Sequence, residues 1–199
     1  MLHIRKTLVY AEWIDNLRDL QGRARILVRV ERLITGNPGD VRPVGGGVSE
    51  LRIHFGPGYR VYFTQRGLDI VILLAGGDKS SQPKDIQTAL HLANNLEKKN
   101  MATTLTTPYD IADHLRTREE MAAYLEACLA EANGDAAFIA KALGDIARAK
   151  GMSQVAKDAG LSRESLYKAL SGERSPSFDT ILKVMNALGL ELRAQVANP

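Results

Sequence analysis

The 199-residue chain contains a single cysteine, Cys128, so it can form neither an internal disulfide bond nor a cysteine-ligated metal cluster. No apolar run approaches the roughly 18 residues that a membrane-spanning helix needs. The longest run, IVILLA at 70–75, has the length of a strand, and the N-terminal MLHIRK lacks the apolar core of a signal peptide. These absences predict a cytoplasmic protein without membrane contacts, and we expect neither a metal nor any other cofactor.

The composition is that of a globular chain whose charge is unevenly divided. Hydrophobic residues make up 45% and charged residues 25% of the sequence, which suits one large core or two small ones. Residues 1–100 hold 15 Lys/Arg and 10 Asp/Glu, whereas residues 101–199 hold 11 and 13. This imbalance is compatible with a polyanionic partner, with binding of the two halves to each other, and with ordinary variation in composition.

The folding pattern changes at Met101. Before it the chain mixes strand and helix patterns, and after it the strongly periodic segments are helical. Residues 100–108 (NMATTLTTP) are rich in Thr and have no periodicity, which is typical of a linker, and the run from Met101 looks like the start of another protein. We therefore predict two gene products joined head to tail, with domains at 1–99 and 109–199.

The first domain has the pattern of an α+β fold: two N-terminal helices, an antiparallel sheet and a C-terminal helix. The expected elements are a strand from Ile4, helices at 10–20, 23–34 and 83–96, and strands at 49–55, 59–65 and 68–75. The turns GPG at 56–58 and RG at 66–67 are short enough for antiparallel hairpins.

Polar side chains recur on one face of the two middle strands. Alternation places Arg52 and His54 together on the first strand and Arg60 and Tyr62 together on the second, while Lys79 follows the next strand. Such cationic and phenolic groups suit a phosphodiester and its pentacovalent transition state. By residue type alone, a solvated sheet face on which Arg and Tyr cover apolar surface is slightly favoured.

The runs ELRIHFGPGYRVYF at 50–63, LLAGGDKSSQ at 73–82 and DI at 85–86 closely resemble the RelE/ParE toxin superfamily, above all its HigB-like branch of addiction module killer proteins. The resemblance covers nearly all of residues 1–97. It implies a compact fold like that of microbial ribonucleases and, in the RelE branch, cleavage of mRNA on the ribosome. There a base activates the ribose 2′-hydroxyl, cations stabilise the phosphorane, and an acid protonates the leaving 5′-oxygen.

The resemblance also implies roles for individual residues. Arg60 matches the phosphate-stabilising arginine of the family, Arg52 and His54 match basic positions on the preceding strand, and Lys79 matches a further cation. RelE-type members carry a tyrosine beyond that loop, whereas residues 81–89 contain none, so His54 or Tyr62 is expected to act as general acid or base. ParE-like members act on DNA gyrase without such a catalytic set, and gyrase stays an alternative target.

The second domain has the pattern of a helical bundle. Thr117 and Glu120 form a capping-box pattern before a helix that ends at NG, 133–134, and Asp135 precedes a helix to about residue 150. His114 and Cys128 have no partners at ligand spacing, so we expect no metal site, and Cys128 is expected to be a buried small apolar residue.

The run MSQVAKDAGLSRESLYKALSG at 152–172 has helix-turn-helix spacing, with Gly160 in the turn. A generic helical hairpin is the simpler alternative, but the continuation SGERSPSF at 171–178 and LKVMNALGL at 182–190 argues against it. This pattern leaves five polar residues at the exposed start of the recognition helix, where they can reach bases or phosphates: Ser162, Arg163, Glu164, Ser165 and Lys168.

These runs resemble the Cro/C1-type helix-turn-helix family. Together with YDIADHL at 109–115 and YLEA at 124–127, they resemble HigA-like addiction module antidote proteins over about residues 102–197. The resemblance implies that the segment before the DNA-binding part neutralises a toxin. It also implies that a homodimer represses the operon by binding operator DNA.

The two resemblances together predict a fused toxin–antitoxin protein whose toxin half acts on mRNA at the ribosome. The linker would keep the antitoxin at a high effective concentration, through an intramolecular or intersubunit contact. The charge asymmetry suggests that four acidic residues lie near toxin arginines: Asp110, Asp113, Glu119 and Glu120. The alternative is a transcriptional regulator whose toxin-like half has lost catalysis, as the missing tyrosine would suggest.

Overall fold

The computed structural model describes residues 3–68, 70–97, 106–173 and 175–193. The chain divides into two compact units, Met1–Ile111 and Ala112–Pro199. None of the described helices is both long enough and apolar enough to cross a bilayer. In the same ranges, no three His, Cys, Asp or Glu side chains gather as a metal ion would require.

The first unit is built on one mixed sheet in the strand order β2-β3-β4-β5-β1-β6. Its strands are β1 (His3–Thr7), β2 (Val41–Gly45), β3 (Val48–Ile53), β4 (Tyr59–Arg66), β5 (Ile70–Gly77) and β6 (Thr106–Pro108), and its helices are α1 (Leu8–Asn16), α2 (Leu20–Ile34) and α3 (Gln82–Glu97). β1 runs parallel to β5, and the other neighbouring strands are antiparallel.

The sheet differs from the sequence-based expectation in two respects. It is not purely antiparallel, because β1 inserts beside β5 in parallel register. It also has two strands that were not predicted: β2, whose VRPVG sequence contains Pro43, and β6, which lies in the segment 100–108 that was predicted to be a linker. Of that segment, residues 100–105 lie outside the described residues.

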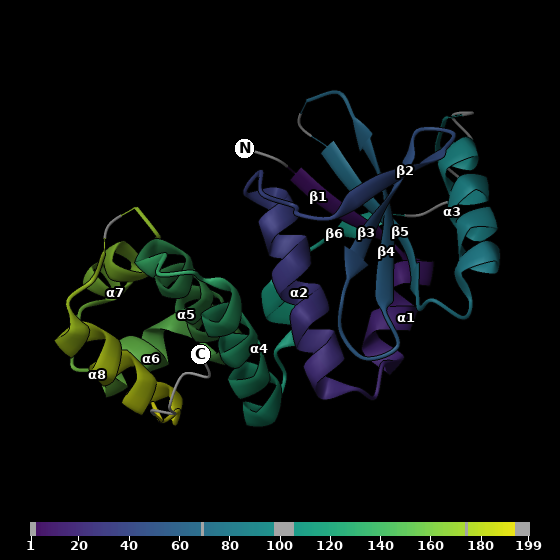
Figure 1. The fold of residues 1–199 in the computed structure, drawn as a ribbon. Coiled ribbons are helices and arrows are strands. Elements are labelled where there is room, and N and C mark those ends of the chain that lie inside the picture. Colours follow the sequence, from purple (N-terminus) through teal and green to yellow (C-terminus); the bar gives the residue numbers. More distant parts are fainter. Residues whose placement is uncertain (1–2, 69, 98–105, 174, 194–199) are drawn as a thin grey trace. The chain divides into compact units, whose positions relative to one another are not determined.

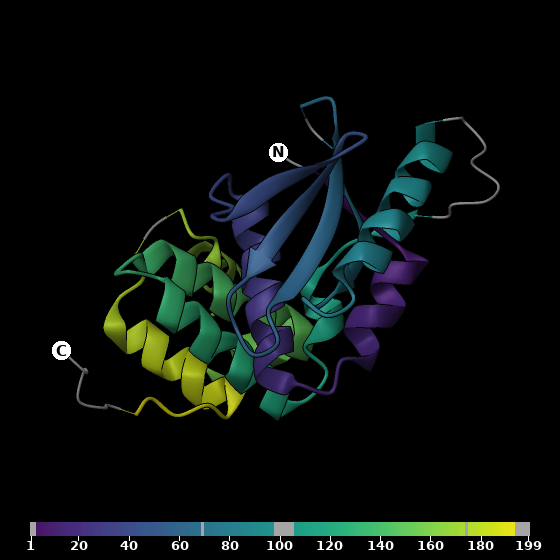
Figure 2. The ribbon, with the colours of Figure 1, turned by 45° about the vertical axis from the view of Figure 1, so that its right-hand side comes forward.

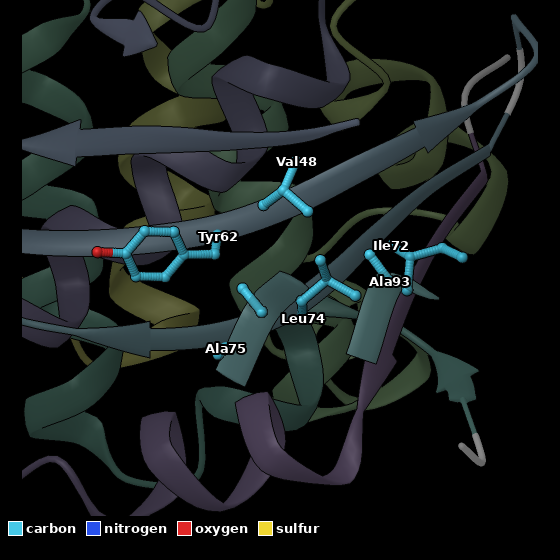
Figure 3. Packing of buried hydrophobic residues seen from close by; sticks show 7 residues of the cluster. Val48, Tyr62, Ile72, Leu74, Ala75 and Ala93 are labelled. Carbon is cyan, nitrogen blue, oxygen red and sulfur yellow. The ribbon is translucent and has the colours of Figure 1, made fainter. Parts of the chain in front are cut away.

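Helices cover both faces of the sheet. Figure 1 shows α2 and α3 on opposite sides of it, and Figure 2 shows β3 and β4 crossing in front of α2. Under α3, the buried core joins strand residues to two small helix residues (Figure 3): Val48, Tyr62, Ile72, Leu74 and Ala75 pack with Ala89 and Ala93. On the opposite face, Asp19 is the N-cap of α2. Its carboxylate accepts hydrogen bonds from Gly22 N at 2.9 Å and from Tyr59 Oη at 2.9 Å.

Two adjacent glycines at the end of β5 let both helix layers approach the sheet. A Cβ atom at Gly76 would lie 2.1 Å from the ring of Trp13 on α1. A Cβ atom at Gly77 would lie 1.8 Å from a carboxylate oxygen of Asp85 on α3. Any larger residue at either position would therefore force the neighbouring side chain to shift, because real Cβ atoms do not come so close to their neighbours.

The second unit is helical. Its elements are η1 (Ile111–His114, at the junction of the units), α4 (Arg118–Glu131), α5 (Ala136–Lys150), α6 (Met152–Asp158), α7 (Arg163–Leu170) and α8 (Phe178–Leu188). The predicted capping box of Thr117 and Glu120 is present, and Asp135 caps α5. Cys128 is buried, as predicted.

Small residues precede two further helices of this unit. α6 has Gly151 at its N-cap. α8 begins at Phe178, and Ser177 caps it. Residues 190–193, which follow α8, form neither helix nor strand.

Candidate functional site

A buried carboxylate organises the polar face of β3 and β4. Glu50 is only 1% exposed. Its Oε2 lies 2.7 Å from Nε of Arg52, and its Oε1 lies 2.9 Å from Nε of Arg60. Gln82, the first residue of α3, donates to Oε1 at 2.7 Å, and the hydroxyl of Tyr62 donates to it at 3.3 Å. One carboxylate thus binds groups from β3, β4 and α3, which we call the Glu50 cluster.

Strand register explains why these groups meet. Arg52 lies directly opposite Arg60 across the β3–β4 pair, and Glu50 lies directly opposite Tyr62. Like charges at such a pair repel each other, and the neighbouring carboxylate offsets this repulsion. The Glu50 hydrogen bond also raises the pKa of Arg52 above its ordinary value. The side chains of Arg52 and Arg60 keep 22% and 12% of their surface exposed, so both guanidinium groups are fixed yet accessible.

Lys79 lies beside the Glu50 cluster on an exposed turn. Gly77, two residues earlier, pairs with Arg60 across β4 and β5. A Cβ atom placed on Gly58 would lie 3.4 Å from Nη1 of Arg60 and 3.8 Å from Cβ of Lys79, so both residues border the same turn. Nη1 of Arg60 donates to the carbonyl oxygen of Gly58 at 2.6 Å. The structure therefore brings Arg52, Arg60 and the base of Lys79 together.

His54 lies outside the Glu50 cluster. It follows the last residue of β3, its side chain is 77% exposed, and its Nε2 lies 2.8 Å from Oδ2 of Asp40. The hydrogen bond from His54 lowers the pKa of Asp40 below its ordinary value. The carbonyl oxygen of Asp40 also accepts from the backbone N–H of Arg52 at 2.9 Å. The imidazole is thus held at the margin of the cluster by a carboxylate that the sequence did not single out.

Tyr62 is not available for the acid–base role that the sequence suggested. It is 0% exposed and belongs to the core under α3 (Figure 3). Burial raises its pKa well above that of an ordinary tyrosine, and the negative charge of Glu50 raises it further. A phenol with no exposed surface cannot exchange a proton with a bound ligand, so this prediction is corrected: Tyr62 packs the core and donates to Glu50.

Sequence reasoning missed Glu50, Gln82 and Asp40. Alternation does place Glu50 on the same face as Arg52, which was an available signal. An acidic residue on a strand is usually solvated, however, and the sequence does not show that α3 covers this one. Two fixed guanidinium groups with a lysine and an imidazole beside them can bind an anion and stabilise added negative charge on it.

The second unit exposes a different polar surface along α7. All five residues predicted to bind DNA are exposed there: Ser162, Arg163, Glu164, Ser165 and Lys168. Ser162 caps the helix, because its Oγ accepts from the backbone N–H of Ser165 at 3.0 Å. Leu166 and Leu170 are buried on the opposite side. The turn before α7 contains Gly160 at φ +67°, a backbone conformation that favours glycine.

Tyr167 belongs to this surface although the sequence did not single it out. Its side chain is 44% exposed, and the guanidinium of Arg163 lies 5.5 Å from the centre of its ring. A shallow hollow beside them is also lined by Ser153 and Gln154 of α6. The available signal was the spacing, because positions 163 and 167 lie one helical turn apart. The surface therefore offers a guanidinium stacked on an aromatic ring, amide and hydroxyl groups, and the Lys168 ammonium.

Comparison with known proteins gives a family for the second half of the chain. Residues 105–196 match the model of a family described as probable addiction module antidote protein. Two relatives from Haemophilus influenzae, both described as uncharacterized proteins, are 54% identical over 87 residues and 46% identical over 95 residues. The matches cover 44% and 48% of this chain but 88% and 96% of the relatives. No solved structure matches the chain.

Proposed function

Because residues 105–196 match the family model of probable addiction module antidote proteins, we propose that the chain is a fused toxin–antitoxin protein of the cytoplasm. The antidote match supports a toxin–antitoxin role. In this proposal the first unit is a RelE/ParE-like toxin that cleaves mRNA on the ribosome. The second unit is a HigA-like helix-turn-helix antitoxin that neutralises the toxin and represses its own operon.

The observation that carries the toxin assignment is the Glu50 cluster. A phosphodiester held between Arg52 and Arg60 would meet two positive charges whose positions are already fixed, so little reorganisation is needed as negative charge grows on the phosphorus oxygens. Lys79, exposed on its turn, supplies a third charge. His54 is the exposed imidazole at the margin of the cluster, and Asp40, whose Oδ2 lies 2.8 Å from its Nε2, would stabilise its charged form after it accepts the 2′-hydroxyl proton.

The test is an in vitro translation assay with the full chain and with a chain that ends at residue 111, the end of the first unit. We expect ribosome-dependent mRNA cleavage by the shortened chain, weaker cleavage by the full chain, and none by the shortened chain with Arg60→Ala. Arg18→Ala, an exposed arginine between α1 and α2, is the matched control and should leave cleavage unchanged. Cleavage that survives Arg60→Ala would overturn the assignment.

Two other outcomes have defined meanings. Inhibition of DNA gyrase without mRNA cleavage would assign the first unit to a ParE-like toxin. Absence of both activities in a folded chain would favour a transcriptional regulator with a catalytically inactive toxin-like unit.

The proposed operator binding requires a second copy of the chain, because a helix-turn-helix of this type reads two half-sites about one DNA turn apart. Exposed apolar side chains on α4 and α8 support a homodimer: Leu129, Phe178 and Leu182 are 46%, 68% and 39% exposed. A hollow beside them is lined by Leu129, Ile139 and Ile181. Phe178→Asp should convert a dimer to a monomer in analytical ultracentrifugation, and a dimer that persists would place the interface elsewhere.

A further inference from the structure

A short strand of the antidote-family half is part of the sheet of the first unit. The family match begins at residue 105, yet β6 (Thr106–Pro108) pairs with β1 at one edge of the sheet. The compact unit that contains the Glu50 cluster extends to Ile111. The family match and the compact structural units therefore divide the chain at different places. Residues 106–111 belong both to the family match and to the first unit.

The contacts between β6 and β1 involve both side chains and backbone. Nε of Arg5 donates to Oγ1 of Thr106 at 2.8 Å, and Nη2 of Arg5 donates to the carbonyl oxygen of Thr106 at 2.5 Å. The backbone N–H of Tyr109 donates to the carbonyl oxygen of Ile4 at 3.0 Å. A charged side chain that satisfies two groups of one residue is a specific contact, and it is stronger than a neutral hydrogen bond.

Tyr109 adds an aromatic contact beyond the strand. The ring of Tyr109 meets that of Tyr10 edge to face, with 6.3 Å between the ring centroids. Nζ of Lys6 lies 5.5 Å from the centroid of the Tyr109 ring. Tyr10 is completely buried, and Lys6 is 9% exposed. Tyr109 therefore packs against side chains that are themselves buried in the first unit.

Pro108 fits the edge position. Since Tyr109 donates to Ile4, the next pair along the ladder, Arg5 with Pro108, falls where antiparallel strands exchange no hydrogen bonds. A residue without an N–H loses nothing there, and on an outer strand it discourages a further strand from pairing. The sequence TTPY at 106–109 thus suits an added edge strand.

From these contacts we propose that the outer edge of β1, with Arg5, Lys6 and Tyr10, is a docking surface for the extended TTPY segment of the antidote half. This strand addition holds the two halves together even when the connecting residues are cut. The inference rests on the proposed function for its biological meaning. β6 is separated from β4, which carries Arg60, by β5 and β1. Docking of this segment therefore provides attachment and does not itself cover the Glu50 cluster.

The test replaces residues 98–105 of the full chain with the recognition sequence of a specific protease, cuts the folded protein and follows the two pieces by size-exclusion chromatography. Both pieces keep the native sequence outside residues 98–105. We expect the pieces to elute together. Arg5→Ala and Tyr109→Ala should each weaken their association about ten-fold, whereas Thr107→Ala, an exposed position of the same strand, should not.

A competition experiment on the unsubstituted cut protein avoids any effect of a substitution on folding. An excess of a synthetic peptide of residues 104–112 should release the C-terminal piece, and a scrambled peptide should not. Association that neither the peptide nor Tyr109→Ala weakens would overturn the proposal, as would separation of the pieces immediately after cutting. These readouts measure binding alone, so an inactive toxin unit would refute the proposed function without deciding the docking.

Discussion

The two units present cations in opposite ways. In the first unit, Arg52 and Arg60 lie on neighbouring strands and share one carboxylate that is 1% exposed. In the second, Arg163 lies on the first turn of a short helix and contacts the ring of Tyr167. Among the described residues, Arg163 has no carboxylate within ion-pair distance.

This difference indicates which kind of ligand each surface suits. Guanidinium groups held by a buried acid have little freedom, so they match charge that develops at one point in space. An arginine that only rests on an aromatic ring can reorient, which suits a search along base edges and phosphates. If this comparison is correct, loss of one acidic residue should damage the first surface as a whole, whereas losses on α7 should be separate and moderate.

The largest expected effect comes from removing the acid of the first surface. Glu50→Gln leaves Arg52 and Arg60 opposite each other without a negative charge, and breaking a buried ion pair in this way costs about 3–5 kcal/mol. The single tryptophan, Trp13, packs against Gly76 in the first unit, so urea unfolding followed by its fluorescence reports on this unit. Glu12→Gln, an exposed acid on α1, is the control. A loss below about 1 kcal/mol would show that the two arginines do not depend on Glu50.

The second unit also has a buried acid, but this one joins helix α5 to helix α4. Asp145 is 3% exposed, and it accepts from Tyr124 Oη at 3.1 Å and from Arg148 Nη2 at 2.6 Å. Asp145→Ala should lower the unfolding free energy by about 2–3 kcal/mol, less than in the first unit, because the Arg148 side chain is 40% exposed and can be hydrated. Thermal unfolding by circular dichroism measures this, with Asp179→Ala, at an exposed position of α8, as the control. An effect as large as that of Glu50→Gln would remove the contrast.

The sequence predicted best those features that depend on a few neighbouring residues. The capping box of Thr117 and Glu120 and the cap Asp135 were found because each involves only a single turn of helix. β6 was missed because nothing local distinguishes residues 106–108 from a linker. They form a strand only where the edge of β1, about a hundred residues earlier in sequence, offers hydrogen bonds and Arg5.

In the candidate site too, only the features that depend on neighbouring residues were predicted from the sequence. Alternation within β3 and β4 was enough to group Arg52 with Arg60, because side-chain direction is a local property of a strand. The burial of Glu50 and Tyr62 depends on α3 and its first residue, Gln82. His54 was expected in the group, but β3 ends at Ile53 and the imidazole bonds to Asp40 instead.

On α7, substitutions should have moderate and separable effects on the proposed operator binding. Arg163→Ala should weaken binding to the DNA upstream of the gene by about 1–3 kcal/mol if the guanidinium reads a base. Lys168→Ala should weaken binding to all DNA sequences alike and reduce its salt dependence if the ammonium contacts phosphate. Fluorescence anisotropy at several salt concentrations distinguishes the two. Lys183→Ala on α8, an exposed lysine paired with Asp179, should change neither, and an equal loss in all three variants would indicate unspecific attraction.

The smallest expected effect is a change in titration at the margin of the first surface, where the exposed His54 and the carboxylate of Asp40 lie beside the Glu50 cluster. The hydrogen bond from His54 is the main cause of the lowered pKa of Asp40, and the charge of Arg42, 4.0 Å away, contributes less. Because the folded pKa is lower than the unfolded one, near 3.9, this pair stabilises the fold above about pH 4. The contribution is lost as the pH falls through the lowered pKa of Asp40. NMR titration of the Asp40 carboxyl should show its pKa rising toward the ordinary value in His54→Ala and rising less in Arg42→Ala. Equal shifts would mean that nearby positive charge, and not the hydrogen bond, lowers the pKa of Asp40. His54 would then not be fixed by a carboxylate, as Arg163 is not.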